Sequence, residues 1–469
     1  MKNPTKTILF SLTALLLFAF AIQQHTGLFK FKELNGVTQT NAKPQWNFRD
    51  LRDGTLQRNF EAYNKDHYGF REPLTRLYNQ NLWTFFRYSK VAEDRRIVFS
   101  DNNWLFEPWT VEEYYGNRFY RFAKDSADMA HKLDAEAQRL RQLKSILDPL
   151  GIHLFVAILP GKETVCAEHM PKKTEGFCKK QFTAADYYSK RLEELDVDLV
   201  DFRKWFVQIK DTVDYPLFPQ TGTHWSNLAA LHVADSLLHY LEQLGGMNLL
   251  DLKIGSVYQR TVKPDNDLES LMNLIWPLKK APNYLAGYRF IDDSTAVRPK
   301  IITIGDSFYW NIINTASFGS AFSSFPYWYY FSTAYFNYPY QNVSELDLLA
   351  EVLSSNFIML SYSTATIYGM SNGFSERLLL ELCYENEEID ARLNQIRNAI
   401  LSDTAWKDRV SFQAWRKERL FEKELTYEIN ATVFDNLETY FPALCDSIPT
   451  QRSKRFLQYT EHKPFDKTN

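Results

Sequence analysis

The 469-residue chain has no strong net charge of either sign. Its 54 Lys and Arg residues are nearly balanced by 57 Asp and Glu residues, which gives a formal net charge of −3. Nucleic-acid-binding proteins instead carry a clustered excess of basic residues that neutralises phosphates. The composition therefore argues against a nucleic acid as partner.

Cysteine is scarce as well, with only Cys166, Cys178, Cys383 and Cys445 in the whole chain. A small, even number is compatible with disulfides in an exported protein. Cys166 and Cys178 bracket a loop and could form a local bridge, with buried free thiols as the alternative. No spacing of cysteines indicates a metal site. The spacing of His232, Asp235 and His239 could mimic metal ligands, but we expect these residues to form the polar side of an amphipathic helix, and we expect neither a metal nor another cofactor.

Long apolar runs are absent except at the N-terminus, where Lys2 and Lys6 precede the uncharged stretch Thr7–Ile22. This layout is typical of a secretion signal that is either retained or removed. The run is shorter than the roughly 17–25 residues of a spanning helix, although residues 25–29 could extend it. We expect a retained anchor, with cleavage after Ala21 as the alternative. The positive flank predicts that the rest of the chain lies outside the cytoplasm, and the lack of a nearby cysteine excludes a lipoprotein-type anchor.

Apolar strands alternate with amphipathic helices in the middle of the chain. A helical pattern at 127–147 precedes Ile152–Leu159, a nearly continuous apolar run typical of a buried parallel strand. Further helices are expected at about 184–195 and at 226–244, and further strands at 197–201, 300–304 and 357–360. The alternation predicts an α/β layered domain with a mostly parallel sheet. We divide the chain into a signal-anchor or signal peptide (1–22), a tether and aromatic, Arg-rich region (23–125), the α/β domain (126–375) and a C-terminal helical region (376–469).

The stretch Gly305-Asp-Ser-Phe308 closes one of these strands and holds the strongest candidate for chemistry. It places the Ser307 hydroxyl where the N-terminus of the next helix can support an oxyanion. A serine needs a base within hydrogen-bond reach, and His224 upstream is the candidate. The alternatives are a helix N-cap for Ser307 and a partly buried histidine stacked on Trp225 for His224.

These two segments resemble the signature segments of AlgJ/AlgX-like proteins, the SGNH-hydrolase-like acetyltransferases of bacterial exopolysaccharide modification. The histidine precedes the serine here, as it does in that family. The resemblance covers roughly residues 46–375 and includes, in the same order, Tyr63–Arg71, Asn103–Phe106, Leu159–Lys162 and Asp267-Leu268. It implies an SGNH-hydrolase-like layered fold and an O-acyltransferase that works through a serine acyl-enzyme.

One position departs from the family, which usually carries Asp two residues before the histidine, where this chain has Gly222. That carboxylate fixes the imidazole tautomer, and its loss typically costs orders of magnitude in rate. We take Asp267 as the third catalytic candidate. Asp201, Asp306, a serine–histidine dyad and a degenerate site remain alternatives. Asp306 adjoins the serine, so we expect its side chain to point away into a supporting turn.

Four further residues are candidates for substrate binding, and the Ser307 amide is the candidate oxyanion donor. Lys162 is expected to line the site, with a solvated loop charge as the alternative. Arg71 could bind an anionic sugar, although a structural ion pair is the competing interpretation. Tyr335 and Tyr338 belong to an aromatic run whose rings suit the faces of sugars, unless the run is simply a buried strand and its loop.

The function that the resemblance implies is acetyl transfer to an exopolysaccharide or cell-surface glycan. The polysaccharide is one expected partner, and an integral-membrane acyl donor of the MBOAT type is another. The expected location is the periplasmic face of the inner membrane, or the periplasm if the signal is cleaved. A carbohydrate acetyl-esterase and a non-catalytic carbohydrate-binding or assembly subunit are the alternatives, and Gly222 is the best argument for the latter.

Overall fold

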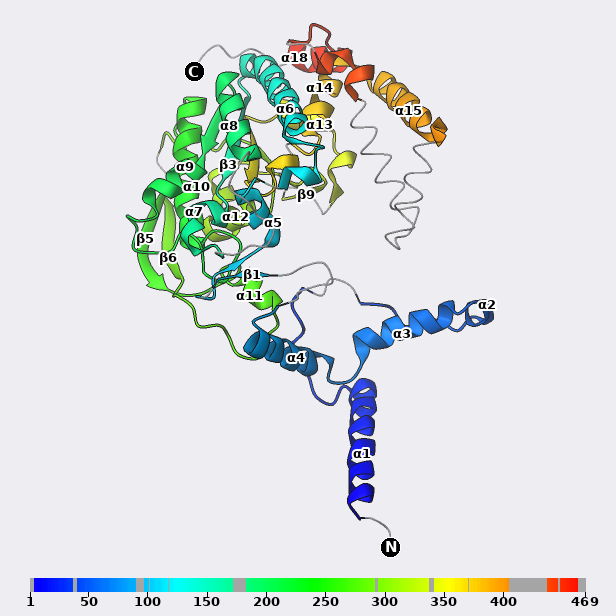
Figure 1. Ribbon diagram of the computed structural model, residues 1–469. Helices are drawn as coiled ribbons and strands as arrows, with labels where there is room; N and C mark the ends of the chain where they lie inside the picture. Colours follow the sequence, from blue (N-terminus) through cyan, green and yellow to red (C-terminus); the bar gives the residue numbers. More distant parts are fainter. Residues whose placement is uncertain are drawn as a thin grey trace.

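A computed structural model of the protein describes residues 4–36, 40–89, 97–100, 102–116, 118–171, 183–291, 294–336, 341–369, 371–404, 437–445 and 448–462. Its centre is a sheet surrounded by helices (Figure 1). This sheet has seven strands in the order β10-β9-β8-β7-β11-β3-β4. The strands are β3 (His153–Leu159), β4 (Asp198–Asp201), β7 (Ile301–Gly305), β8 (Tyr327–Tyr329), β9 (Thr333–Tyr335), β10 (Gln341–Asn342) and β11 (Phe357–Ser363).

The five strands from β8 to β4 pair in parallel, and β9 and β10 extend the sheet antiparallel at one edge. Strands β3, β7 and β11 are buried along almost their whole length because helices cover both faces of the sheet. This burial explains their continuous apolar sequences, and it confirms the predicted α/β class with a mostly parallel sheet.

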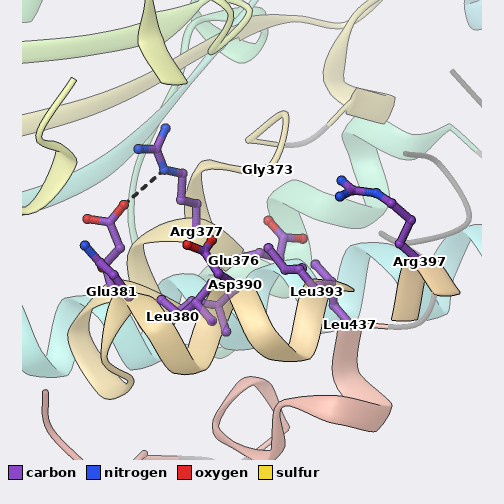
Figure 2. A pocket seen from close by; sticks show the side chains of 11 residues that line it. Gly373, Glu376, Arg377, Leu380, Glu381, Asp390, Leu393, Arg397 and Leu437 are labelled. Atoms are coloured by element: carbon purple, nitrogen blue, oxygen red, sulfur yellow. Dashed lines mark hydrogen bonds and ion pairs between the residues drawn. The ribbon is translucent and has the colours of Figure 1, made fainter. Parts of the chain in front are cut away.

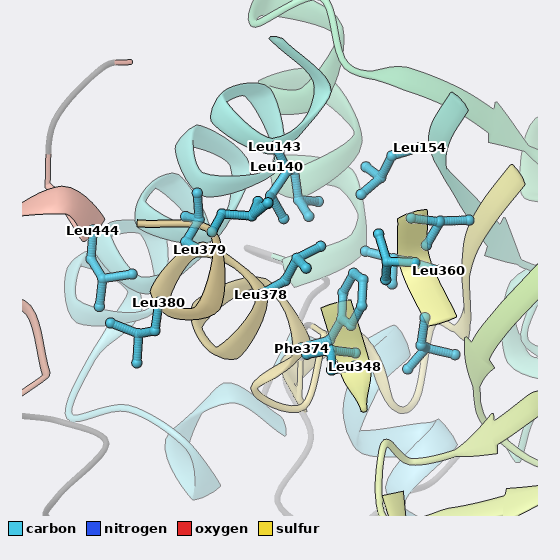
Figure 3. Packing of buried hydrophobic residues seen from close by; sticks show 14 of the residues in the cluster. Leu140, Leu143, Leu154, Leu348, Leu360, Phe374, Leu378, Leu379, Leu380 and Leu444 are labelled. Carbon is cyan, nitrogen blue, oxygen red and sulfur yellow. The ribbon is translucent and has the colours of Figure 1, made fainter. Parts of the chain in front are cut away.

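Side chains of each strand alternate between two cores. In β3, Leu154, Val156 and Ile158 face the core that also contains apolar side chains of α6 (Ser126–Leu147), α8 (Ala184–Glu194), α13 (Leu348–Leu353) and α14 (Phe374–Cys383). Figure 3 shows part of this core, where Leu378 and Phe374 lie close to Leu360 of β11. The opposite face packs on α9 (Phe202–Ile209), α10 (Asn227–Gly245) and α12 (Tyr309–Ala316).

Smaller elements surround one end of the sheet. They are β1 (Val98–Phe99), β2 (Leu105–Phe106), α5 (Pro108–Tyr114), α7 (Lys162–Val165), α11 (Asp267–Leu271) and the antiparallel pair β5 (Asp251–Gln259) and β6 (Tyr284–Ile291). The 3-10 helices are Arg118–Arg121, Asp148–Leu150, Ala167–His169, Phe318–Ala321, Val343–Glu345, Ile367–Gly369 and Pro442–Leu444. Among the smaller elements, β2, α7 and α11 matter most for the site described below.

The two ends of the chain are helical. The N-terminal α1 (Pro4–Thr26) is long and apolar enough to cross a membrane, and it is followed by α2 (Phe48–Arg52), α3 (Thr55–His67) and α4 (Arg71–Phe86). The C-terminal region contains α15 (Asn386–Ser402) and α18 (Lys454–His462) after α14. Both features agree with the predicted fold class, whereas the domain boundaries at 22, 125 and 375 stay predictions. Cys166 is a buried free thiol, and Cys178 lies outside the described residues.

Candidate active site

Ser307 lies between the end of β7 and the start of α12, at the carboxyl edge of the sheet. The turn that holds it is built on the buried side chain of Asp306. Its Oδ1 accepts from the Phe308 amide at 3.0 Å, and its Oδ2 accepts from the Ser363 amide at 2.8 Å and the Ser363 hydroxyl at 2.6 Å. Asp306 therefore supports the turn, as expected, and is turned away from the reactive hydroxyl.

His224 reaches Ser307 from the loop that precedes α10. The Ser226 side chain caps that helix by accepting from the Ala229 amide at 3.2 Å. The imidazole packs against the Phe308 ring with centroids 4.8 Å apart. Its Nε2 lies 2.9 Å from the Ser307 Oγ, which is within the distance needed for proton transfer.

Asp267, the first residue of α11, completes the arrangement from the other side of the imidazole. Its Oδ2 lies 2.6 Å from the His224 Nδ1, and its Oδ1 accepts from the Thr223 amide at 2.7 Å. A carboxylate at Nδ1 requires the ring proton there, which leaves Nε2 free to accept the Ser307 proton. Asp201, the other remote acid considered, instead binds Arg203, with 2.7 Å between its Oδ2 and the Arg203 Nη2.

Gly222 explains why the carboxylate comes from a distant part of the chain. A Cβ at this position would lie 2.8 Å from the Pro219 Cγ and 2.9 Å from the Asp265 carbonyl oxygen. The segment that leads to Asp267 therefore passes through the space that a side chain at 222 would need. Position 222 has no acidic side chain, and Asp267 supplies the carboxylate that His224 needs.

The electrostatic setting of His224 favours its protonated form. Burial alone would lower the pKa of His224, but the hydrogen bond that its Nδ1 donates to Asp267 and the charge of that carboxylate outweigh burial and raise the pKa above its ordinary value. The negative charges of Glu107 and Asp306 act in the same direction. A base with a raised pKa accepts the serine proton more readily, so the site is electrostatically suited to general-base work.

The Ser307 amide is the candidate oxyanion donor. Within the described part of the chain, this N–H makes no hydrogen bond to a backbone or side-chain acceptor. It lies at the entry to α12, where the helix N-terminus favours negative charge. A tetrahedral intermediate on Ser307 could therefore direct its oxygen at this donor.

The Lys162 ammonium is directed at three backbone carbonyl oxygens, which differs from the expectation that it lines the site. Its side chain is buried, and its Nζ donates to the carbonyl oxygens of Leu105 at 2.7 Å, Gln220 at 3.0 Å and Gly222 at 2.8 Å. Burial lowers the pKa of Lys162 to about 7, against the opposing influence of nearby acidic groups, among them Asp267. The ammonium ties β2 to the loop that carries His224, so Lys162 is a positioning residue.

Replacing Lys162 with Met is expected to lower the free energy of unfolding by about 3 kcal/mol, because the buried carbonyls lose their shared donor. Chemical denaturation of the full chain measures this difference. Lys204→Met is the matched control, since Lys204 is exposed and forms a surface pair with Glu193 at 2.9 Å. A loss no larger than that of the control would contradict the positioning role.

The remaining candidates for substrate binding lie in different places. Arg71 begins α4 in the N-terminal region and pairs with Asp66, with 3.7 Å between the Arg71 Nη2 and the Asp66 Oδ1. Arg71 thus forms the structural ion pair that was the alternative to its binding an anionic sugar. Tyr335 is half-buried in β9 and packs edge-on against Trp310 of α12 at 4.9 Å between centroids. Tyr338 lies outside the described residues.

Sequence reasoning missed Glu107. Its Oε2 accepts from the Thr223 hydroxyl at 2.8 Å, so it braces the residue next to His224. Its charge also raises the pKa of His224. The available signal was its position directly after Asn103–Phe106, one of the segments that carries the family resemblance.

Two cavities lie on the α14 side of the sheet. One of about 520 Å³ lies between α14 and α15, where Arg377 pairs with Glu381 at 3.0 Å, and none of the residues lining it belongs to the catalytic group (Figure 2). The other, of about 720 Å³, is lined in part by Tyr330. The amide of Tyr330 donates to the Gly305 carbonyl at 2.9 Å, so this second cavity begins beside the end of the strand that carries Ser307.

Comparisons with known proteins agree with the resemblance seen in the sequence. Residues 97–313 match the family described as SGNH hydrolase-like domain, acetyltransferase AlgX, and this segment contains Ser307, His224 and Asp267. No curated protein matches the chain.

Among solved structures, the O-acetyltransferase domain of Pseudomonas putida AlgJ is 15% identical and covers 60% of this chain and 99% of its own, with a TM-score of 0.40. Pseudomonas aeruginosa AlgX is 16% identical, with coverages of 60% and 67% and a TM-score of 0.38. Bacillus cereus PatB1 is 12% identical, with coverages of 60% and 100% and a TM-score of 0.36. At these TM-scores the structural likenesses add no argument of their own. On the family match, residues 97–313 are similar to the SGNH hydrolase-like domain of AlgX-type acetyltransferases.

Proposed function

We propose that this protein is an O-acyltransferase that moves an acetyl group onto a hydroxyl of an exopolysaccharide or cell-surface glycan through an acyl-enzyme on Ser307. The observation that carries the proposal is the continuous relay of hydrogen bonds from Ser307 Oγ through His224 to Asp267. A serine hydroxyl with a base at 2.9 Å and an oriented imidazole is the arrangement that nucleophilic acyl transfer requires.

In the first half-reaction, the Ser307 Oγ attacks the carbonyl carbon of an acetyl donor while its proton passes to the His224 Nε2. The negative charge on the carbonyl oxygen is directed at the Ser307 amide. Collapse of the tetrahedral intermediate breaks the bond to the leaving group, which takes the proton from His224. The acetyl group is then held as an ester on Ser307.

In the second half-reaction, a sugar hydroxyl gives its proton to His224 and attacks the acetyl ester. The bond to Ser307 breaks, and the serine oxygen recovers the proton from His224. The cavity that begins at Tyr330 is a candidate acceptor site, because it lies beside the strand end that precedes Ser307 and is lined by aromatic and charged side chains, among them Phe122, Lys132 and Glu136.

The setting of the reaction follows from the N-terminus and the resemblance. The helix α1 would hold the chain at a membrane, and the resemblance implies the periplasmic face of the inner membrane. The same resemblance implies an integral-membrane partner of the MBOAT type that supplies acetyl groups from the cytoplasm.

Two other functions compete for the same site. An acetyl-esterase would use water in place of the sugar hydroxyl, and a carbohydrate-binding subunit would perform no chemistry. The argument for the latter was Gly222, and the position of Asp267 beside His224 weakens it.

The test is to incubate the full chain with an acetyl-ester reporter and an acceptor oligosaccharide, and to follow both products by mass spectrometry. We expect acetylated oligosaccharide to form as the reporter is consumed, and an acetyl adduct to remain on Ser307 when the acceptor is left out. Release of acetate with no acetylated sugar would favour the esterase. Neither product nor adduct would favour the binding subunit.

A further inference from the structure

The outward face of α4 is largely apolar, with the exposed Asn81 as a polar residue among its apolar side chains. Leu74, Leu77, Tyr78 and Phe85 are 36%, 48%, 63% and 74% exposed. Their spacing of three, four and eleven residues from Leu74 places all four on one side of the helix. Surface helices of soluble domains place their apolar side against the core, so α4 has the reverse arrangement.

The opposite face of α4 is the one that binds the catalytic domain. The Asn79 side chain donates to the Met272 carbonyl at 2.8 Å, and the Gln80 Oε1 accepts from the Trp276 amide at 3.1 Å. Trp83, on the same face, is buried and packs edge-on against Phe99 with centroids 4.9 Å apart. The other side of α4 contacts the domain, so the apolar stripe Leu74–Phe85 faces away from the domain.

Other large aromatic side chains are exposed at α2, at the end of α4 and on the segment that binds α4. Trp46, Phe48 and Phe86 are 80%, 83% and 72% exposed, and Trp276, which hydrogen-bonds to α4, is 65% exposed. Soluble monomers rarely leave a contiguous apolar patch such as the stripe of α4 uncovered. Trp and Tyr are favoured where one side of the ring is in lipid and the other in water.

The turn between α3 and α4 is packed onto the end of the apolar helix α1. A Cβ at Gly69 would lie 2.2 Å from the Phe20 carbonyl oxygen, so only glycine allows the two backbones to approach so closely. Phe70 packs edge-on against Phe20 at 5.4 Å between centroids, and the Gln24 side chain donates to that of Asn64 at 3.2 Å. Figure 1 shows α3 and α4 extending to either side of this end of α1, with the sheet domain on the far side.

We infer that α2, α3 and α4, which we call the collar (residues 40–89), lie on the surface of a lipid bilayer with the stripe of α4 in the boundary between headgroups and acyl chains. This inference rests on the proposal that α1 is retained in the membrane. A helix with one apolar aromatic face and basic residues elsewhere is the kind that lies in this boundary. The collar contains eight Lys and Arg against five Asp and Glu, whereas the whole chain has a net charge of −3, so anionic headgroups are the favoured contact.

The collar would then fix the height and tilt of the catalytic domain above the membrane. The Asn79, Gln80 and Trp83 contacts bind the domain to α4 on one side, and lipid would bind α4 on the other. An acyl donor delivered at the membrane would meet Ser307 at a defined distance from the bilayer.

The test uses spin labels on the full chain in vesicles of phosphatidylethanolamine and phosphatidylglycerol. Labels are placed at Tyr78→Cys and Phe85→Cys, with Cys178 and Cys445 changed to Ser to remove background labelling. Lys190→Cys on α8 is the control, because the Lys190 side chain is 77% exposed and lies on the catalytic domain. Flotation with the vesicles first establishes that the chain is bound to them.

We expect the ratio of accessibility to oxygen over accessibility to a water-soluble nickel chelate to be several-fold higher at positions 78 and 85 than at 190. Equal ratios at the three positions in floated protein would overturn the inference, as would a failure to float. Protection of positions 78 and 85 only after an integral-membrane protein is added would also overturn it, since the stripe would then bind protein. Each labelled variant must keep the unfolding transition of the parent, and Leu77→Cys on the same stripe replaces a variant that does not.

Discussion

A Ser307→Ala variant is expected to lose acetyl transfer by about 10⁴-fold or more, because it lacks the hydroxyl oxygen that attacks the donor and carries the acetyl group. His224 and Asp267 would remain in place without a nucleophile to activate. The initial rate of formation of acetylated oligosaccharide measures the loss. The mass of the protein after exposure to donor alone gives a second measurement, since the wild type should gain one acetyl group and the variant none.

The matched control for this experiment is Ser320→Ala. Ser320 is exposed in the 3-10 helix that follows α12, so it undergoes the same chemical change in a neighbouring segment with no contact to His224. We expect it to retain the wild-type rate. Transfer by Ser307→Ala at the rate of Ser320→Ala, with both proteins folded, would exclude the acyl-enzyme mechanism.

The core of the fold could be predicted from the sequence because parallel strands buried on both faces leave an unmistakable pattern. The apolar runs at 152–159, 300–304 and 357–360 correspond to β3, β7 and β11, whose side chains are almost all buried. The position of Ser307 followed from the same pattern, since the residue after a buried strand lies at the carboxyl edge of the sheet. The role of Asp306 in supporting the turn could be predicted because Asp306 directly precedes the serine.

Lys162 could not be assigned in this way. A lysine after a strand end is compatible with a solvated charge, a ligand for an anion or a buried donor, and composition does not separate them. Its three acceptors come from β2 and from the loop before His224, and residues more than 50 positions apart meet only in the folded chain. Periodicity reports which face of an element is buried, but not where a long side chain finds its partners.

The outward orientation of the apolar side of α4 could not be predicted from the sequence for a related reason. The sequence shows an aromatic and Arg-rich region there, but the side of the helix that meets the domain is determined by contacts with Met272 and Trp276, almost 200 residues away. An apolar stripe is ordinarily assigned to the core. Only the docked position of Trp83 reveals that the stripe Leu74–Phe85 faces outward.

Replacing Asp267 with Asn is expected to slow acetyl transfer by about 10⁴-fold while leaving the fold intact. The Asn amide can donate to the His224 Nδ1, which would move the ring proton to Nε2. The Nε2 could then no longer accept the proton of Ser307. Asp214→Asn is the control, since Asp214 is an exposed acid in the loop before His224, and we expect it to retain the wild-type rate.

The pH dependence distinguishes this role from a merely structural one. Acylation needs neutral His224, so kcat/KM should rise with pH through the pKa of that residue, which lies above its ordinary value of 6.5. In Asp267→Asn the burial of the imidazole remains, but the charge and the hydrogen bond that raise its pKa are gone. The acid limb of the profile should therefore move to lower pH in the variant. An acid limb at the same pH in both proteins would mean that an acid other than Asp267 raises the pKa of His224.

Adding the family's carboxylate at position 222 is not expected to rescue this variant. In Gly222→Asp/Asp267→Asn, the new Cβ would meet the Pro219 Cγ at 2.8 Å and the Asp265 carbonyl oxygen at 2.9 Å. Backbone atoms cannot yield as a flexible side chain does, so the segment that enters α11 would have to move away from the loop of His224. We expect the double variant to transfer acetyl no faster than Asp267→Asn alone. Recovery of the wild-type rate would contradict the claim that the space beside His224 admits a carboxylate only from α11.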